Sequence, residues 1–296
     1  MLFAILAILS FALQNTCCKE YGNRYPNTVH AQAVMIFVSL SVVAAIMAAL
    51  GGAQPLTPRG YLLALAFGVA FVVTLASMTI AMNCGHMGIT LLIQNSSLLI
   101  PTVFGVLVWH EVLTPLKILG IALILALLGL SAGDGEAVAG NVKNWNRKRW
   151  LLITMTACLG DGALSILPGL MSRECATISS VNFTFWTSVF SVAVCAVLLV
   201  YYRMRGQRLP KAVGWREPAI FSGLCAGIGA GTAGGNCFSI LAPTQLPGVV
   251  FFPLRQGGLV LVMWFVGVLL YREKVNRRGL IMLAVGLLGL VLLNLG

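Results

Sequence analysis

The sequence predicts an all-α integral membrane protein with ten transmembrane helices, and two observations carry this prediction. Of the 296 residues, 59% are hydrophobic and only 9% are charged, whereas soluble domains carry about 25% charged residues. The apolar segments run for about 20 residues without strict alternation, as membrane helices do and barrel strands do not. Because lipid offers no hydrogen bonds, the backbone must pair within each segment, and helices achieve this.

Ten apolar segments follow one another with short connections. We expect helices over Leu2–Cys18, His30–Leu50, Tyr61–Met82, Met87–Trp109, Leu116–Leu130, Trp150–Met171, Val181–Tyr202, Ala219–Ala242, Val249–Tyr271 and Leu280–Leu295. The first segment contains Gln14 and Asn15, and a signal peptide is its alternative interpretation. It shows neither a basic leading stretch nor a convincing cleavage site, so a membrane helix is expected. The longest connections, Ser131–Arg149 and Arg203–Glu217, are too short for an extramembrane domain.

The net charge of +11 reflects basic loops and not a nucleic-acid surface. If the loops are numbered by the helices they join, 15 of the 19 Lys and Arg residues lie in the odd-numbered loops and three in the even ones. The positive-inside rule then places the odd loops in the cytoplasm and both termini outside. We therefore expect a multi-pass protein of the cell (inner or plasma) membrane that contacts lipid and binds no nucleic acid.

The eight cysteines mostly lie inside apolar segments and show neither zinc-type spacing nor a disulfide framework. We interpret them as small apolar packing residues. The sequence also lacks a nucleophile motif, a metal cluster and a phosphate-binding glycine loop. We therefore expect no enzyme activity, no cofactor and no metal.

An internal repeat links the two halves of the chain. A shift of 162 residues aligns Leu92–Glu111 with Leu254–Glu273 without a gap, and seven of 20 positions are identical. The identical pairs include Gln94 and Gln256, Leu99 and Leu261, the runs Gly105–Leu107 and Gly267–Leu269, and Glu111 and Glu273. The fourth helix thus pairs with the ninth, which gives five helices per half. An odd number of crossings inverts the second copy in the membrane, an arrangement that secondary transporters often use.

The repeat defines a division of the chain. We predict a first five-helix repeat over residues 1–132, a basic connecting loop over residues 133–149 and a second repeat over residues 150–296.

The repeated segment carries a family resemblance. Residues Leu99–Glu111, with Pro101 and Gly105 and followed by Gly120, resemble the EamA-like repeat of the drug/metabolite transporter superfamily. The second copy, Gly267–Glu273, is similar. The resemblance implies a carrier of metabolites, amino acids, sugars or drugs with two inverted five-helix repeats. Many such relatives have cytoplasmic termini, opposite to the orientation that the loop charges predict, so import and export both stay open.

Two charged residues inside apolar segments are the main site candidates. Asp161 lies near the middle of the sixth segment, between Gly160 and Gly162, where a charge costs about 2.5–3.5 kcal/mol. It could bind a cationic group, carry a coupling proton or form a structural ion pair. Arg255, which replaces Ile93 at the repeat offset, could bind a carboxylate or phosphate, neutralise Asp161, or extend to the membrane interface.

Uncharged polar residues in other segments complete the predicted site. Gln94 and its neighbours could line a hydrated cavity or bond neighbouring helices. Trp186 could stack on a substrate or pack in the core. The predicted substrate-binding residues are Asp161, Arg255, Gln94, Gln256, Asn95, Ser96, Trp186, Asn236 and Gln14. The glycine-rich eighth segment, Ala219–Ala242, could act as a moving gate or allow close static packing.

Together these features favour a secondary transporter of a small polar or amphipathic metabolite that works by alternating access. Two other functions stay open: a membrane-embedded subunit or receptor without transport, and a lipid flippase. The expected partners are a small-molecule substrate and membrane lipid, and the protein would be a monomer or homodimer.

Overall fold

The structure is a computed structural model that describes residues 2–26, 28–85, 87–100, 147–174, 179–206, 217–241, 248–272 and 277–295, with a few residues between 103 and 126. Its helices are α1 (Leu2–Arg24), α2 (Val29–Ala49), α3 (Pro58–Cys84), α4 (Met87–Asn95), the 3-10 helix η1 (Ser96–Leu98), α7 (Arg147–Glu174), α8 (Ser180–Met204), α9 (Pro218–Leu241), α10 (Gly248–Leu269) and α11 (Arg277–Leu295). Each predicted segment except the fifth overlaps one of these helices. In the fifth, Leu116–Leu130, the described residues 116, 118–123 and 126 are helical, and the rest lie outside the described part of the chain.

The helices have the length and surface of membrane-spanning segments. In the described part of the chain, α1, α2, α3, α8 and residues 148–167 of α7 are long and apolar enough to cross a membrane. Their outer faces carry bare aliphatic side chains: Leu62, Leu152 and Val197 are 67%, 68% and 69% exposed. Such surfaces are stable against lipid and unfavourable in water. The predicted all-α membrane fold is confirmed, while the count of ten spans stays a prediction.

Two helices that the repeat predicts to be equivalent, α2 and α8, begin and end in the same way. The side chains of Thr28 and Ser179 accept hydrogen bonds from backbone N–H groups of the first turn of α2 and α8, at 3.3 and 3.2 Å. Gly51 and Gly206 follow these helices in the left-handed region, with φ of 84° and 72°. A hydroxyl N-cap and a left-handed glycine are common helix signals, and both recur here at matching places.

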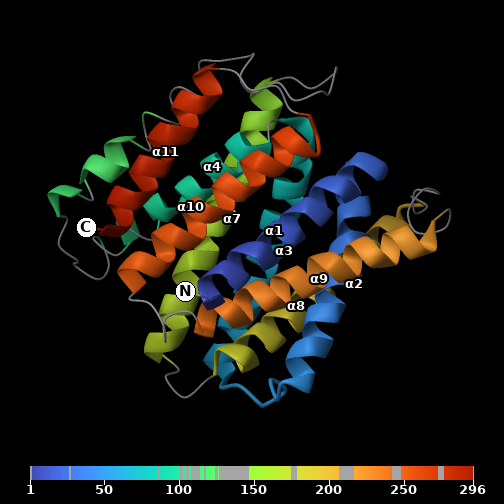
Figure 1. The fold of residues 1–296 in the computed structure, drawn as a ribbon. Helices are drawn as coiled ribbons and strands as arrows, with labels where there is room; N and C mark the ends of the chain where they lie inside the picture. Colours follow the sequence, from blue (N-terminus) through green and yellow to red (C-terminus); the bar gives the residue numbers. More distant parts are fainter. Residues whose placement is uncertain are drawn as a thin grey trace.

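Helix packing follows the same correspondence (Figure 1). α1 packs on α9 as α3 packs on α7, and α2 contacts α9 as α8 contacts α3. α1 contacts α10 as α7 contacts α4, while α2 with α8 and α4 with α10 form self-equivalent pairs. Exchanging α1–α4 with α7–α10 therefore maps each of these contacts onto another of them or onto itself. This is the packing expected of two related halves, although the predicted boundaries at residues 132 and 150 stay predictions.

The described core consists of three clusters of buried apolar side chains, and the two largest lie mainly among α1, α2, α3, α8 and α9 and among α3, α4, α7, α10 and α11. α2 and α8 stand on one side of the bundle, and α4, α10 and α11 gather on the other (Figure 1). α1 lies between them, in contact with α9, α10 and α3. The first apolar segment is therefore an integral helix of the bundle.

Glycines on α9 bring it close to α1. A Cβ atom added at Gly231 would lie 2.6 Å from the carbonyl oxygen of Ser10, and one added at Gly235 would lie 2.6 Å from the ring of Phe11. Gly229 faces α2 in the same way, 2.6 Å from the carbonyl oxygen of Ser39. The glycine-rich segment thus forms a closely packed interface with both helices, and a gating role for it stays a prediction.

Candidate functional site

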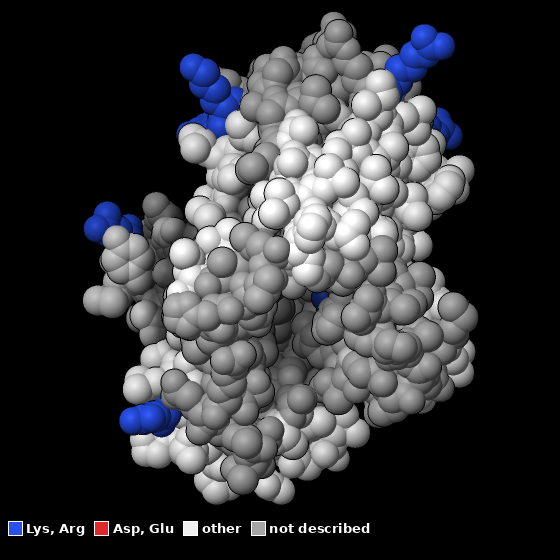
Figure 2. All heavy atoms as spheres, turned by 90° about the vertical axis from the view of Figure 1, so that its left-hand side faces the viewer, with Lys and Arg blue, Asp and Glu red and all other residues white. Residues whose placement is uncertain are grey.

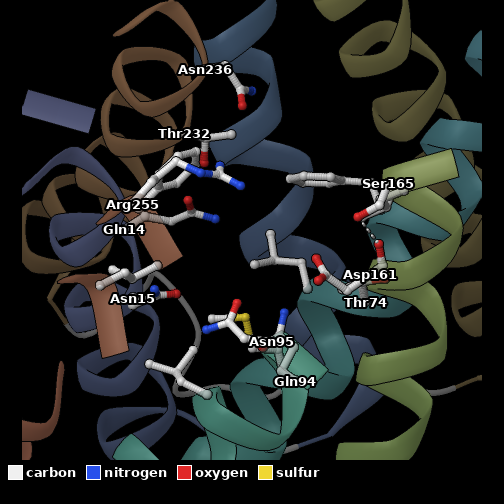
Figure 3. Close-up of a pocket in the computed structure, with 17 residues that line it drawn as sticks. Gln14, Asn15, Thr74, Gln94, Asn95, Asp161, Ser165, Thr232, Asn236 and Arg255 are labelled. Atoms are coloured by element: carbon white, nitrogen blue, oxygen red, sulfur yellow. Dashed lines mark hydrogen bonds between the residues drawn. The ribbon is translucent and has the colours of Figure 1, made fainter. Parts of the chain in front are cut away.

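A polar cavity of about 170 Å³ lies at the centre of the bundle. Its wall is built by α1, α3 and α4 from the first half of the chain and by α7, α9 and α10 from the second. These are three pairs of helices that the exchange of halves relates to one another. The polar residues of the wall are Gln14, Asn15, Thr74, Gln94, Asn95, Asp161, Ser165, Thr232, Asn236 and Arg255 (Figure 3).

Asp161 forms the acidic part of the wall. Its Oδ2 accepts a hydrogen bond from the hydroxyl of Ser97 in η1, at 2.5 Å. The flanking Gly160 and Gly162 allow this placement, because a Cβ at either position would collide with Thr74 of α3 or with Ile100. The Gly-Asp-Gly sequence therefore packs α7 closely against the first half and presents the carboxylate to the cavity.

Arg255 forms the basic part of the wall, from α10. Its Cζ lies 5.5 Å from the centroid of the Phe11 ring, which is within cation–π range. Its Nε is buried and has no hydrogen-bond acceptor among the described residues. No ion pair joins Arg255 to Asp161, and the two side chains occupy different parts of the wall with the cavity between them (Figure 3). They interact electrostatically over this separation.

Amide side chains line the wall between the two charges. Gln14 and Asn15 lie on the Arg255 side, and Gln94 and Asn95 lie below the space between Arg255 and Asp161 in the view of Figure 3. The Oε1 of Gln94 and the Nδ2 of Asn95 are buried without a hydrogen-bond partner in the described part of the chain. A buried polar atom left unbonded costs about 1–3 kcal/mol. The wall therefore favours a hydrated or polar occupant over an apolar one.

The structure brings six of the nine predicted site residues to this cavity: Gln14, Gln94, Asn95, Asp161, Asn236 and Arg255. Ser96 is not among the wall residues, and its hydroxyl donates to the carbonyl oxygen of Leu92 at 3.1 Å. Trp186 also lies away from the cavity, and the binding role predicted for it has no support in this placement. Its Nε1 donates to the carbonyl oxygen of Gln54 at 2.7 Å, and its ring packs edge-on against Tyr61. The side chain of Gln256 lies outside the described residues.

Sequence reasoning missed three polar positions of the wall, Thr74, Ser165 and Thr232, and noted Asn15 without including it in the predicted site. A spacing of four residues connects them to others in the wall. Asp161 and Ser165 share one face of α7, and Thr232 and Asn236 share one face of α9. A search for polar residues four positions apart on the segments would have found these two pairs.

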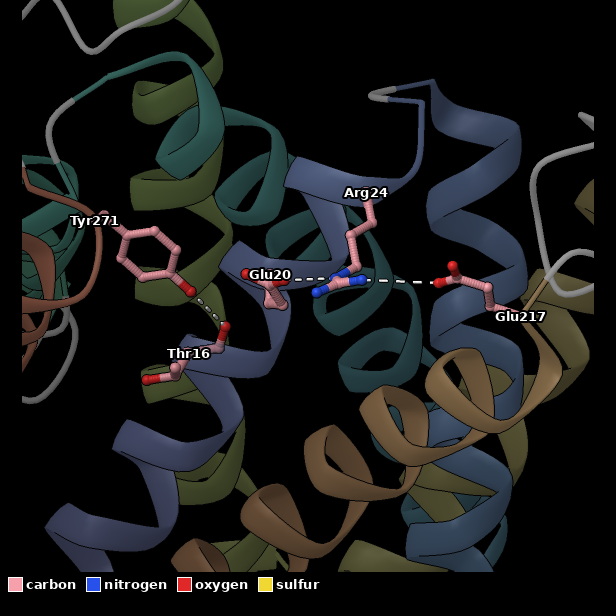
Figure 4. Close-up of polar contacts among 5 residues, drawn as sticks. All are labelled: Thr16, Glu20, Arg24, Glu217 and Tyr271. Carbon is pink, nitrogen blue, oxygen red and sulfur yellow. Dashed lines mark hydrogen bonds and ion pairs between the residues drawn. The ribbon is translucent and has the colours of Figure 1, made fainter.

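A buried layer lies beyond the cavity, where α1, α3 and α10 end. Lys19, only 6% exposed, donates from Nζ to the carbonyl oxygen of Met82 near the end of α3. The same Nζ lies 5.7 Å from the ring centroid of Tyr271, and the Tyr271 hydroxyl donates to the carbonyl oxygen of Thr16 at 3.4 Å (Figure 4). This layer ties α1 to α3 and to the end of α10, and closes the described part of the bundle at this end.

Surface ion pairs extend the same closure. Arg24, at the end of α1, lies between Glu20 of its own helix and Glu217 at the start of α9, at 2.5 and 3.7 Å (Figure 4). Exposed pairs of this kind contribute about 1 kcal/mol or less. The buried Lys19 contact is therefore the stronger tie between α1 and its neighbours.

A face of the molecule at right angles to the view of Figure 1 shows a hollow, with atoms of Lys or Arg visible inside it (Figure 2). The fold and the cavity together define a helical membrane protein with a charged, polar centre between two related halves. Residues 1–132 match the model of the EamA-like transporter family. The match confirms, for this part of the chain, the resemblance to the drug/metabolite transporter superfamily. The first 132 residues are therefore similar to a family of membrane transporters.

The fold extends along the whole chain. A solved structure described only as "Crystal structure of protein" superposes with a TM-score of 0.61, at 15% sequence identity, and covers 98% of this chain and 94% of its own. At this identity the likeness concerns the fold alone. No curated protein matches the chain.

Proposed function

We propose that the protein is a secondary transporter of a small polar solute, which binds in the central cavity and crosses the cell membrane by alternating access. The main support for this proposal is the composition of the cavity wall. Three helices from each half supply the wall, and it includes Asp161 and Arg255, two charged residues that lie inside predicted spans. Binding at the interface of inverted repeats near the membrane midplane is the usual arrangement in such carriers.

The depth of the wall residues supports this proposal. Asn15 lies in the middle part of α1, and Asp161 and Arg255 lie in the middle parts of α7 and α10. Charged groups at such depth are costly and usually serve a solute or ion pathway. Because the sequence carries no nucleotide-binding motif, the transport would be driven by a gradient or would run downhill.

The packing supports alternating access. The Lys19 layer closes one end, and the exchange of α1–α4 with α7–α10 relates that end to the opposite one. In the second state, equivalent contacts would form at the opposite end and the Lys19 layer would open. Rocking of two such halves around a central site is the general scheme of inverted-repeat carriers.

Cysteine accessibility tests this proposal without knowledge of the solute. Ser165→Cys and Thr232→Cys, each in a variant whose eight native cysteines are replaced, would be treated from either side of oriented vesicles with a charged thiol reagent that does not cross membranes. We expect labelling of both positions from both sides. Leu159→Cys is the control. Leu159 lies on the outer face of α7 and is 61% exposed, so a cysteine there should face lipid and not react from either side.

Labelling from one side only would contradict alternating access and favour a receptor or subunit without transport. A direct assay completes the test. Proteoliposomes would be incubated with a metabolite mixture, and their contents analysed by mass spectrometry against protein-free liposomes. We expect accumulation of a polar solute that is absent with Asp161→Asn. Movement of a labelled lipid between leaflets without solute uptake would favour a flippase instead.

A further inference from the structure

From the charges of the cavity we infer that its solute is a small zwitterion, with a cationic amine at Asp161 and a carboxylate at Arg255. This inference rests on the proposed function and names its substrate class. Among the described residues, the first half of the chain contributes ten to the wall, none of them charged, and the second half contributes one acid and one base among its seven. The described part of the wall therefore carries one charge of each sign, and both come from the second half.

Asp161 and Arg255 do not neutralise each other through direct contact. No ion pair joins Asp161 to Arg255, and the two side chains lie apart in the cavity wall (Figure 3). In the described residues the Asp161 carboxylate accepts hydrogen bonds from the hydroxyl of Ser97 and from the side chain of Gln94. An ionised carboxylate has about four acceptor sites, so capacity for an ammonium group remains.

Arg255 has matching capacity for an anion. Its described contacts are the ring of Phe11 and the distant field of Asp161, and its buried Nε has no acceptor in the described part of the chain. A guanidinium binds a carboxylate through two parallel hydrogen bonds, a geometry that few other side chains offer. The neighbouring amides of Gln14 and Asn15 can hold the carboxylate in place (Figure 3).

Charge balance selects the zwitterion over singly charged solutes. A free anion at Arg255 would leave Asp161 buried without a cationic partner, and a free cation at Asp161 would leave Arg255 in the same position. An uncompensated buried charge is strongly unfavourable. A solute with one charge of each sign satisfies both groups and leaves the cavity neutral.

The volume sets the size of the solute. A cavity of about 170 Å³ corresponds to roughly six water molecules at the liquid volume of about 30 Å³ each. A small amino acid or betaine has a comparable number of non-hydrogen atoms.

A blocked-charge series tests the inference on detergent-purified protein. The zwitterions would be glycine, alanine, β-alanine, γ-aminobutyrate and glycine betaine. Alaninamide and N-acetylalanine supply the matched cation and anion, at slightly acidic pH so that the amines are charged. Ligands of the folded state raise the melting temperature. We expect at least one zwitterion to raise it, and both blocked compounds to bind about 10- to 100-fold more weakly than alanine, the loss expected for one charged hydrogen bond.

Two charge-neutral variants separate a binding role from a structural one. Asp161→Asn should bind N-acetylalanine better than the unmodified protein does, because the anion no longer leaves a buried carboxylate unpaired. Arg255→Gln should bind alaninamide better for the converse reason. Thr156→Ala, on α7 but not among the wall residues, removes a hydroxyl bonded to the carbonyl oxygen of Leu152 and should keep the preference for zwitterions. A gain of binding of this kind cannot result from misfolding.

Equal or stronger binding of a blocked compound by the unmodified protein would overturn the inference, and so would binding of none of the zwitterions. Unchanged ligand preference in both charge-neutral variants would overturn it too. These failures are distinct from failure of the proposed function. Labelling of Ser165→Cys from both membrane sides would uphold transport with another solute class, whereas zwitterion binding with one-sided labelling would uphold the site and refute transport.

Discussion

The Ser97 hydroxyl hydrogen-bonds to the Asp161 carboxylate across the interface between the two halves of the chain, at 2.5 Å. Ser97 is 1% exposed and belongs to η1 of the first half, whereas Asp161 belongs to α7 of the second. The acidic group of the cavity is thus oriented by the half that itself supplies no charge to the wall. Any movement between the halves that separates η1 from α7 must change the environment of this carboxylate.

Removal of this hydroxyl should weaken the site. We expect Ser97→Ala to lower the free energy of unfolding by about 1.5–3 kcal/mol, the usual contribution of a hydrogen bond to a charged group, and to weaken binding of amine-bearing solutes. Thermal melts in detergent with and without solute measure both effects. Ser191→Ala, which removes a buried hydroxyl bonded to the carbonyl oxygens of Gly68 and Thr187, is a control on destabilisation alone. Weaker solute binding in this control as well would argue against a local effect.

Loss of the Lys19 ammonium should loosen the closed end of the bundle. Lys19→Met keeps the length and apolar stem of the side chain but removes the contact with the Met82 carbonyl oxygen. We expect faster reaction of the buried Cys84, at the end of α3, with a thiol reagent added from that end. Arg24→Met, which removes only exposed ion pairs, should leave the Cys84 rate nearly unchanged. A similar rate in both variants would show that Lys19 does not hold the closure.

The glycine contacts of α9 should tolerate substitution at one position and not at another. In Gly231→Ala the new methyl group would meet the backbone of α1 at Ser10 and Gln14, so we expect a loss of several kcal/mol of stability or no folded protein. Gly223→Ala, on the same helix with no atom within 4 Å of the new methyl group, should be neutral or stabilising by up to about 1 kcal/mol. Melting temperatures of the two variants give the comparison. Equal effects would contradict the close packing of α1 and α9.

Arg255 should not be replaceable by lysine. Arg255→Lys keeps the positive charge but replaces the planar guanidinium with a single ammonium group. We expect the variant to retain the preference for zwitterions over cations, with affinity reduced about tenfold or more through loss of one of two parallel hydrogen bonds. Titration of the thermal shift with the best zwitterion measures this change. Full affinity in the lysine variant would show that charge alone, and not the two-donor geometry, binds the carboxylate.

The apolar segments of the sequence predict which parts of the chain are helical better than they predict where each helix ends. α1 continues to Arg24 although its apolar run stops at Cys18. Charged residues end an apolar run but not the helix here, because the Lys19 ammonium is bonded to the end of α3 and Arg24 forms ion pairs at the surface. The hydropathy of a single segment does not predict such contacts with other segments.

The sequence predicts those residues of the candidate site whose charge is unfavourable inside a membrane. Asp161 and Arg255 are recognisable because a charge inside an apolar segment costs free energy and is rare unless it has a function or a partner. Thr74 and Thr232 do not stand out, since a threonine can bond its own helix, as both do to the carbonyl oxygen four residues earlier. The separation of the two charges could not be predicted either. It depends on how α7 and α10 are rotated about their axes, which the packing of the other helices decides.

The wall of the cavity is less symmetric than the helices that build it. Because its acid and its base are both supplied by the second half, the site has a fixed head and tail, even though the scaffold around it is nearly interchangeable. A bound solute with unlike ends would keep one orientation throughout. Its remaining substituents would then face the same neighbours on every passage, and the mirror image of a chiral solute could satisfy both charges only by exchanging those neighbours. Although the two halves supply nearly equivalent helices, such a site would distinguish the two enantiomers of a chiral solute.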